Sequence, residues 1–321
     1  MNIQQIQYVL SVGELRNFGK AADKCFISQS TLSTMIGKLE SEIGITIFDR
    51  RSKPITITNE GEKIIEQLKV IARELNMLQE VVSDLKGELA GTLRIGAIPT
   101  VGPYILPLFL NKFVEQFPNI QFEVSEITTE KIVDHLEKRQ LDIGIVSLPL
   151  NNPKLEEIPL YEEPFLFYDA QESSYSKAVS IKKIDARRLW LLEEGHCMRV
   201  QVEQICKLKK EMTTSKRNLN YKSGTVDTLV KLVDNNKGIS FLPQLATLGL
   251  SEQQREHLWQ IEAPVPVRSV GLLVHRHFVK KKILNLLKTA IQQHIEPYLF
   301  SPSDTTQLFS PLEVSNKKSS K

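Results

Sequence analysis

The stretch FGKAADKCFISQSTLSTMIGKLESEIGITIFDR, residues 18–50, decides the architecture of the first part of the chain. Asn17, just before it, is a good N-cap for a short helix whose small alanines let another helix approach closely. After a brief link, Ser28 is a good N-cap for a further helix. The apolar residues of that helix are spaced by four, three and four positions, as on one buried face: Leu32, Ile36, Leu39 and Ile43. Together with the helical pattern of residues 3–12, these spacings predict three helices around one core.

The opposite face of this third helix is polar. Its first turns carry short, uncharged side chains: Gln29, Ser30, Thr31, Ser33 and Thr34. Such groups hydrogen-bond both phosphates and base edges. Helix-turn-helix proteins point this part of their recognition helix into the major groove of DNA. We therefore expect these five residues to contact double-stranded DNA.

The next residues, ITIFDRRSKPITIT at 45–58, predict a β-hairpin because isoleucines alternate on both sides of a turn. The turn holds Arg50, Arg51 and Lys53, three cations that can pair with phosphates. Taken singly, hydroxyl-bearing helices and basic turns are ordinary solvated surface. The order helix, helix, turn, helix, hairpin instead favours a winged helix-turn-helix DNA-binding domain over residues 1–58.

Residues 59–88 predict one long linker helix. Its apolar residues alternate in spacing between four and three: Ile64, Leu68, Ile71, Leu75, Leu78, Val82 and Leu85. This is the heptad seam of a coiled coil, which predicts a homodimer formed through this helix. The alternative is that the seam packs on its own chain.

Residues 89–300 alternate strand and helix patterns and predict two α/β lobes with a ligand cleft between them. The first strand, at 92–98, is followed at once by Thr100, where parallel sheets place their sites. Strands are also expected at 189–194 and 218–223. The last residues, 301–321, are rich in serine and lysine and predict a flexible tail.

Composition excludes few classes of protein. The net charge is only +3, so a basic DNA-binding surface must be local. No apolar run approaches the length of a membrane span, and the N-terminus lacks a secretory pattern. We therefore expect a cytoplasmic protein without membrane contact. Cysteines stay reduced in that compartment, and the odd number of three argues against a structural disulfide framework.

Two of the three cysteines lie in EEGHCMRVQVEQIC, residues 193–206. A helix pattern begins near Cys197, so its sulfur should feel the positive field of a helix N-terminus. Arg199 and His196 add to that field, and both are expected to favour the thiolate, making Cys197 a candidate for reaction with peroxide. Cys206 lies deeper in the helix and by itself resembles an ordinary core cysteine.

Helix geometry limits what the two cysteines can do together. Nine residues of helix separate their Cα atoms by about 13 Å and place them on opposite faces. A disulfide tolerates at most roughly 7 Å, so bonding would require the helix to unwind. The ligands are too few for a zinc site, no Cys-x-x-Cys motif is present, and no histidine is singled out as a hydrolase base. No metal or cofactor is expected.

Residues 18–50, with IGAIPTVGPYILP at 95–107 and LLEEGHCMRVQVEQIC at 191–206, resemble the LysR-type transcriptional regulators, and among them the peroxide sensors. The resemblance covers nearly all of residues 1–298. It implies a winged helix-turn-helix, a coiled-coil linker and a two-lobed, periplasmic-binding-protein-like regulatory domain, assembled as a homotetramer. It also implies a transcriptional activator of oxidative-stress genes, which is no enzyme.

The same resemblance assigns roles to single residues. It implies that Cys197 is oxidised by hydrogen peroxide and that Cys206 then forms a reversible disulfide with it. Thr100, Thr129 and His196 match pocket residues that hold or polarise peroxide. Glutaredoxin or thioredoxin would reduce the disulfide, and RNA polymerase is a further expected partner.

Three departures from the family pattern stand out. Val200 occupies a position where an aspartate is frequent, which leaves the rate of peroxide reaction open. Ser30 replaces a usual proline and Gly37 a usual basic residue, which leaves the preferred operator open. Two alternatives remain: a regulator of this fold that binds a small metabolite between its lobes, and a thiol peroxidase fused to a DNA-binding domain.

Overall fold

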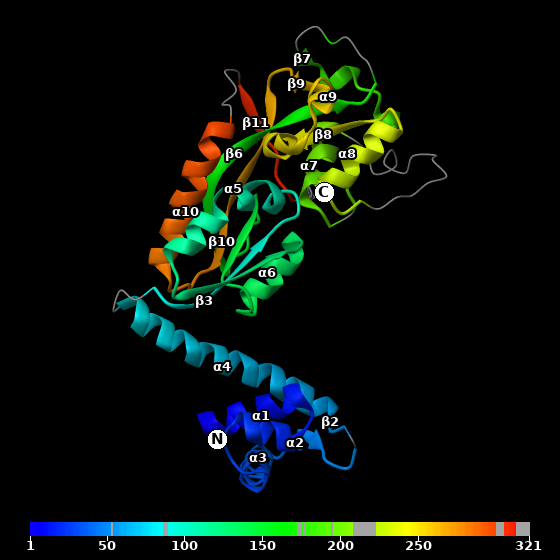
Figure 1. Cartoon of the computed structure of the whole chain (residues 1–321). Coiled ribbons are helices and arrows are strands. Elements are labelled where there is room, and N and C mark those ends of the chain that lie inside the picture. The colour runs from blue at the N-terminus through cyan, green and yellow to red at the C-terminus, as the bar shows by residue number, and fades with distance from the viewer. Residues whose placement is uncertain are drawn as a thin grey trace, which may run out of the picture. The chain divides into compact units, whose positions relative to one another are not determined.

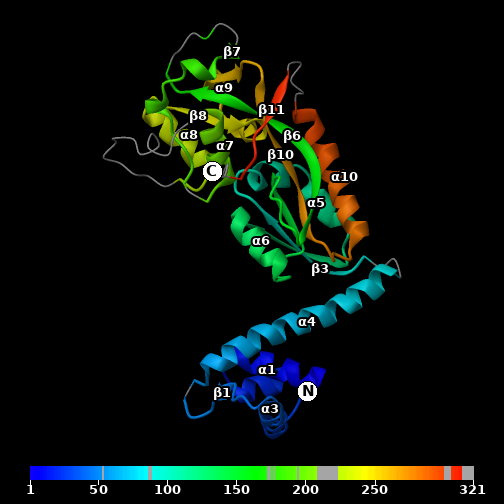
Figure 2. The same cartoon turned by 180° about the vertical axis from the view of Figure 1, so that it is seen from behind.

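The structure, a computed structural model, describes residues 1–52, 54–85, 89–171, 175, 178–193, 195–207, 223–299 and 305–312. The chain forms two compact units, Met1–Gly87 and Glu88–Lys321. Figures 1 and 2 label their helices and strands. Among the residues described, no helix has both the length and the apolar character needed to cross a membrane.

The first unit is the predicted winged helix-turn-helix followed by the linker helix. Its elements are α1 Ile3–Leu15, α2 Phe18–Lys24, α3 Gln29–Ile43, β1 Phe48–Asp49, β2 Thr56–Ile57 and α4 Asn59–Leu85. Asn17 accepts a hydrogen bond from the backbone N–H of Lys20, and Ser28 accepts one from Thr31, so both predicted caps are confirmed. The hairpin pairs Phe48 with Ile57.

Helix α4 divides its heptad seam between two environments. Leu68 is 4% exposed and packs in the core of the first unit. Further along, Leu78 is 62% exposed and Val82 is 43% exposed. The seam therefore packs on its own chain in its first half, as the alternative reading held, and stands open in its second half. Residues 86–88, the expected end of the linker, lie outside the described residues.

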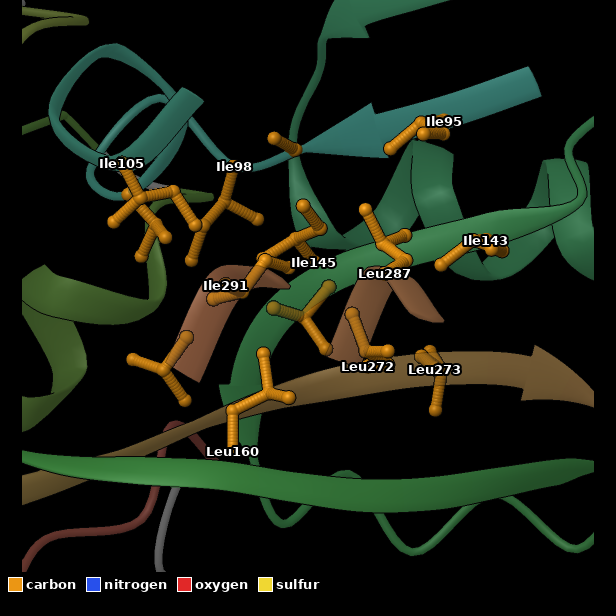
Figure 3. Packing of buried hydrophobic residues seen from close by; sticks show 14 of the residues in the cluster. Ile95, Ile98, Ile105, Ile143, Ile145, Leu160, Leu272, Leu273, Leu287 and Ile291 are labelled. Atoms are coloured by element: carbon orange, nitrogen blue, oxygen red, sulfur yellow. The ribbon is translucent and has the colours of Figure 1, made fainter. Parts of the chain in front are cut away.

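The second unit begins with the predicted β-α-β-α-β segment. It consists of β3 Gly91–Ala97, α5 Gly102–Gln116, β4 Ile120–Glu126, α6 Thr129–Glu137 and β5 Ile143–Leu148. Strand β3 pairs in parallel with both β4 and β5. The crossover from β3 to β4 and the crossover from β4 to β5 run in opposite directions across the sheet. Because such crossovers are right-handed, α5 and α6 cover opposite faces of this sheet. Helix α10, Lys281–Ile295, packs beside α5, and Figure 3 shows the resulting apolar core around Ile145 and Leu272.

The elements that follow along the chain build the second lobe, and two of them, β6 and β10, are shared with the first. These elements are β6 Leu155–Asp169, β7 Ala178–Val179, α7 Cys197–Ile205, α8 Val226–Asn235, β8 Ile239–Pro243, α9 Glu252–Arg255, β9 Leu258–Ile261 and β10 Val265–His275. Strands β6 and β10 are antiparallel and run through both lobes (Figure 1). In the first lobe β10 pairs with β5, and in the second β6 pairs with β8 and β9. Each lobe has its own hydrophobic core, as the two-lobed prediction requires.

The strand expected at 189–194 does not form in the described part of that segment. Leu189 makes an isolated bridge to Ile239, and the backbone N–H of Glu193 donates to the carbonyl of Ser223 at 3.0 Å. Trp190 and Leu192 are buried, which accounts for the alternating apolar pattern that suggested a strand. The strand expected at 218–223 falls almost entirely outside the described residues, as does Lys53 of the wing.

The prediction of a flexible tail at 301–321 is wrong for residues 305–312. Strand β11, Thr306–Leu308, pairs in parallel with Val265–Val267 of β10. Phe309 then packs against the core of the second lobe, and Pro311 is buried. Serine-rich composition suggested mobility, but these apolar side chains and an open edge of β10 fix the segment. Residues 301–304 and 313–321 lie outside the described residues.

Candidate redox site and DNA-facing surface

The two cysteines stand at opposite ends of one helix. Gly195 has a φ of +93°, a left-handed conformation that glycine adopts readily, and it turns the chain into the extended N-cap His196. Helix α7 starts at Cys197 and ends at Ile205, with Cys206 as its C-cap. Both thiols are free. The expectation that an intact helix holds them apart is therefore met in this structure.

The cysteines also belong to different hydrophobic cores. Cys197 is 7% exposed and is a member of the core of the first lobe. Cys206 is partly buried and packs against the core of the second lobe. Helix α7 thus ties one lobe to the other, and any motion that joins the sulfurs must release at least one of these packings.

Hydroxyl groups surround the sulfur of Cys197. Thr129 starts α6 and Thr100 lies in the turn after β3, and both hydroxyls hydrogen-bond to the thiol sulfur. The backbone N–H of Met198 adds a third hydrogen bond. The structure therefore brings together three of the residues singled out from the sequence, although they lie far apart along the chain.

Arg268 is a component of this site that the sequence reading missed. It comes from β10, is 1% exposed, and places its positive charge near Cys197. Its guanidinium pairs with the fully buried Glu163 at 2.7 Å. It also donates to the hydroxyl of Thr100 at 3.1 Å and to the carbonyl of Thr100 at 2.9 Å. An arginine inside an otherwise apolar strand pattern was the available signal, because a buried ion pair is costly to keep.

Burial raises the pKa of the Cys197 thiol. The charge of Arg268 and the hydrogen bonds from Thr129, Met198 and Thr100 oppose this rise without cancelling it. The resting group is therefore a thiol, and the expectation that local charges tip the balance toward the thiolate is not met. Desolvation of the charged form outweighs the local positive field.

The two cations invoked for that prediction do not act on the sulfur. Arg199 donates to Glu203 at 2.9 Å and to the carbonyl of Leu192 at 3.0 Å. His196 is 7% exposed, and burial lowers its pKa even though its Nε2 lies 3.7 Å from Glu193. His196 is consequently a neutral ring at neutral pH.

Cys206 is also a thiol in this state. Burial raises its pKa to about 12, and no charge or hydrogen bond from the described residues offsets that rise. Its thiolate becomes available only when the C-terminal end of α7 opens to water.

Two glutamines of α7 reach the C-terminal segment. Gln201 is fully buried and donates to the hydroxyl of Ser147 at 3.1 Å and to the carbonyl of Phe309 at 2.8 Å. Gln204 donates to the carbonyl of Leu312 at 2.8 Å. These contacts were not foreseen, because they depend on residues 305–312 being ordered.

The polar face of α3 is open. Gln29, Ser30, Thr31 and Thr34 are exposed, and Ser33 is partly buried. Their hydroxyls bond within the helix, as in the pair Ser28–Thr31 at 2.8 Å and the bond from Thr34 to the carbonyl of Ser30 at 2.9 Å. Such hydroxyls can exchange these partners for phosphate or base atoms.

Arg50 is not at the tip of the wing as expected. It folds back onto α3, pairs with Glu40 at 2.7 Å and donates to Ser33 at 3.0 Å. Its guanidinium also lies 5.2 Å from the ring centre of Phe18. The nearly buried Glu40 thus gains a cationic partner, while the Arg50 side chain stays 42% exposed. Arg51 is exposed as well.

Comparisons with known proteins agree with this architecture. The family model described as "Bacterial regulatory helix-turn-helix protein, lysR family" matches residues 3–62. The model described as "LysR substrate binding domain" matches residues 86–295. The chain belongs to the LysR family. Relatives among these transcriptional regulators match the chain along most of its length.

Over 275 residues, this LysR-family chain is 30% identical to the "Hydrogen peroxide-inducible genes activator" of Haemophilus influenzae, covering 85% of the chain and 90% of that protein. Over 277 residues it is 31% identical to the "DNA-binding transcriptional dual regulator OxyR" of Escherichia coli, covering 85% and 89%. A solved full-length OxyR variant from Pseudomonas aeruginosa superimposes with a TM-score of 0.69 at 28% identity, covering 91% and 98%.

The two family models span both surfaces described above. The first contains the polar face of α3, and the second contains Thr100, Thr129, α7 and Arg268. The ordered C-terminal segment at 305–312 lies beyond both models.

Proposed function

We propose that this LysR-family regulator senses hydrogen peroxide by a reversible disulfide between Cys197 and Cys206, and controls oxidative-stress genes by binding double-stranded DNA. The names of its relatives support peroxide as the signal. One observation carries the proposal. A buried thiol, held by two hydroxyls and faced by a guanidinium, begins a helix whose other end bears a second thiol.

In the first step, the sulfur of Cys197 attacks one oxygen of hydrogen peroxide. The S–O bond forms as the O–O bond breaks, and the departing hydroxide takes a proton to become water. Arg268 stabilises the thiolate from which the attack starts. Thr100 and Thr129 orient the peroxide through their hydroxyls, and His196, the N-cap of α7, precedes the reacting cysteine. Burial of the sulfur favours a small, neutral oxidant.

In the second step, α7 unwinds and the sulfur of Cys206 attacks the sulfenic acid at Cys197. The S–S bond forms, the S–O bond breaks, and the hydroxide released becomes water. The two thiols together supply the two electrons that reduce one peroxide. An external dithiol, of the glutaredoxin or thioredoxin class, restores both thiols by exchange.

The output of the switch is a change in DNA binding by a symmetric assembly. We propose that the exposed Leu78 and Val82 continue as a coiled-coil seam in a homodimer, and that dimers pair as a homotetramer. The polar face of α3, with Arg50 at its edge and Arg51 and Lys53 from the wing, would contact each half-site in the cytoplasm. Unwinding α7 changes the packing of both lobes, which is the means of signalling to RNA polymerase.

The buried arginine argues against an anionic metabolite bound at this residue. A carboxylate or phosphate ligand needs a cation with free hydrogen bonds. The guanidinium of Arg268 is already engaged by Glu163 and by two oxygens of Thr100. It is placed to act on the thiol, not to hold an anion.

Mass spectrometry of the full, reduced chain tests the proposal. Brief exposure to less than one equivalent of hydrogen peroxide should yield a linked Cys197–Cys206 peptide that dithiothreitol removes. Cys197→Ser should abolish the reaction, whereas Cys206→Ser should stop at the sulfenic acid. Consumption of one peroxide per chain supports a sensor. Sustained consumption with a thiol reductant would instead indicate the fused peroxidase, and unreacted cysteines would overturn the proposal.

A further inference from the structure

Phe26 is the most exposed large apolar residue of the described part of the chain. It lies in the link between α2 and α3, and 95% of its surface is open to solvent. By contrast, apolar core residues of the two flanking helices, such as Phe18 of α2 and Leu32 of α3, are buried. Phe26 therefore contributes nothing visible to the core of its own unit.

The backbone of Phe26 is also unfavourable for a phenylalanine. Its φ is +57°, in the left-handed region. The bonds from Phe26 N–H to the carbonyl of Asp23 and from Ile27 N–H to the carbonyl of Ala22, both at 3.1 Å, show that it occupies the position just after the end of α2. Glycine is usual there, because other residues pay a steric penalty in this conformation. An exposed aromatic ring and a left-handed backbone are both unfavourable for the isolated chain, which points to a role for Phe26 in binding a partner.

Phe26 lies directly before α3, the helix expected to contact DNA, and this position suggests DNA as the partner. Ser28 caps α3 two residues later, and the exposed polar residues Gln29 and Ser30 follow directly. Phe26 thus lies next along the chain to the surface proposed to contact DNA. In the major groove, the apolar group that a phenylalanine recognises is the C5 methyl of thymine.

We propose that Phe26 contacts the methyl group of one thymine at the edge of each half-site and so helps to determine the operator sequence. This inference rests on the proposed DNA binding. It adds a residue with no charge to a surface whose other members offer hydroxyls, amides and cations. Its contribution must therefore appear in sequence preference and not in salt dependence.

Duplexes selected from a random library by the full, reduced chain provide the probe. Phe26→Gly should bind the selected duplex about tenfold more weakly than the unaltered chain, the usual loss for one base contact. The slope of log Kd against log salt should stay unchanged. The melting temperature should not fall, because glycine suits the left-handed backbone. Ile3→Ala, which removes an apolar group 52% exposed on α1, is the matched control and should bind normally.

Replacing each thymine of the selected duplex by uracil removes one methyl group at a time. One replacement per half-site should weaken the unaltered chain and leave Phe26→Gly unaffected. Equal binding by Phe26→Gly, or the absence of any such uracil position, would overturn the inference. So would a change in the oligomeric state of Phe26→Gly without DNA, since the ring would then meet a second copy. Failure of the unaltered chain to select any duplex would count against the proposed function itself.

Discussion

Cys197 and Cys206 lie at the two ends of α7, and each packs against the hydrophobic core of a different lobe. The distance between them is maintained by a helix and by two cores at once. A disulfide between them is therefore incompatible with the reduced fold. Formation of that bond must be coupled to a structural change, which is the property that a switch needs.

Removal of the buried charge pair should slow the sensor. In the double variant Arg268→Met, Glu163→Gln no unpaired charge stays buried, so the fold should persist, whereas Arg268→Met alone would cost about 3–5 kcal/mol. Without the guanidinium, the pKa of Cys197 rises further. The thiolate fraction at pH 7 falls about tenfold for each pKa unit of that rise. The thiolate also becomes more nucleophilic, so we expect the rate of reaction with peroxide to fall about threefold per unit. Stopped-flow measurement of sulfenic acid formation in a Cys206→Ser background gives this rate.

Glu163→Gln alone is the control for that variant, and its effect should have the opposite sign. It leaves Arg268 uncompensated beside Cys197, so the thiol pKa should fall and the reaction should become faster. The unpaired buried charge should also destabilise the fold by about 3–5 kcal/mol, as in Arg268→Met alone. An equal slowing by both variants would indicate loss of structure instead of loss of charge.

The reaction should speed up with pH well into the alkaline range. Burial raises the pKa of Cys197 above its ordinary value of 9.0, so the thiolate fraction still grows at pH 9. The rate of peroxide reaction should show no plateau below that pH. The free energy of unfolding should change with pH in the opposite direction from the rate. Because the pKa of Cys197 is higher in the folded than in the unfolded chain, its protonation stabilises the fold fully below the unfolded pKa. This contribution declines as pH rises past 9. A plateau near pH 6 would contradict the assignment of a buried, protonated thiol.

The C-terminal segment should restrain the switch. Gln204 donates to the carbonyl of Leu312 only while α7 is intact, so Gln204→Ala removes about 1 kcal/mol from the reduced form alone. Equilibration with glutathione should show the disulfide potential becoming more negative by about 20 mV. Truncation after residue 304, which removes the partners of both glutamines, should shift it further.

Gln292→Ala is the matched control for Gln204→Ala. Gln292 donates to the carbonyl of Leu160 at 2.9 Å, in the first lobe and away from α7. Its loss should affect stability and leave the potential unchanged. Identical shifts from both variants would show that the C-terminal segment has no special connection to the redox helix.

Self-association should depend on the open half of the linker helix. Leu78→Asp places a charge on a residue that is 62% exposed and should weaken dimerisation at least about tenfold without unfolding the chain. Leu286→Asp, on a partly exposed apolar site of α10, should not. Sedimentation velocity at several concentrations distinguishes them. A dimer that survives Leu78→Asp unchanged would exclude this seam as the interface.

Local patterns were sufficient where a structure depends on neighbours in the sequence. The cap at Ser28, the hairpin of the wing and the start of a helix at Cys197 each follow from a few adjacent residues, and the structure contains all three. The same is true of Thr100, whose place after β3 follows from the strand that precedes it.

Contacts distant in the sequence could not be read in this way. Arg268 meets Glu163 and Thr100 across 105 and 168 residues, and no periodicity records such a pairing. The protonation of Cys197 depends on how deeply the lobes bury it, which a helix pattern does not reveal. Strand β11 could not be predicted either, because its partner β10 is distant in the sequence and its own composition resembles a disordered tail.

Hydrogen exchange across α7, compared between the reduced and the peroxide-treated chain, tests the central claim most directly. The backbone bond from Cys206 to the carbonyl of Val202, at 3.0 Å, should protect the end of the helix in the reduced form. Once the disulfide forms, amides between the two cysteines should exchange orders of magnitude faster, while those of α8 keep their protection. A linked Cys197–Cys206 peptide obtained from a chain whose α7 amides remain as protected as before would contradict the account.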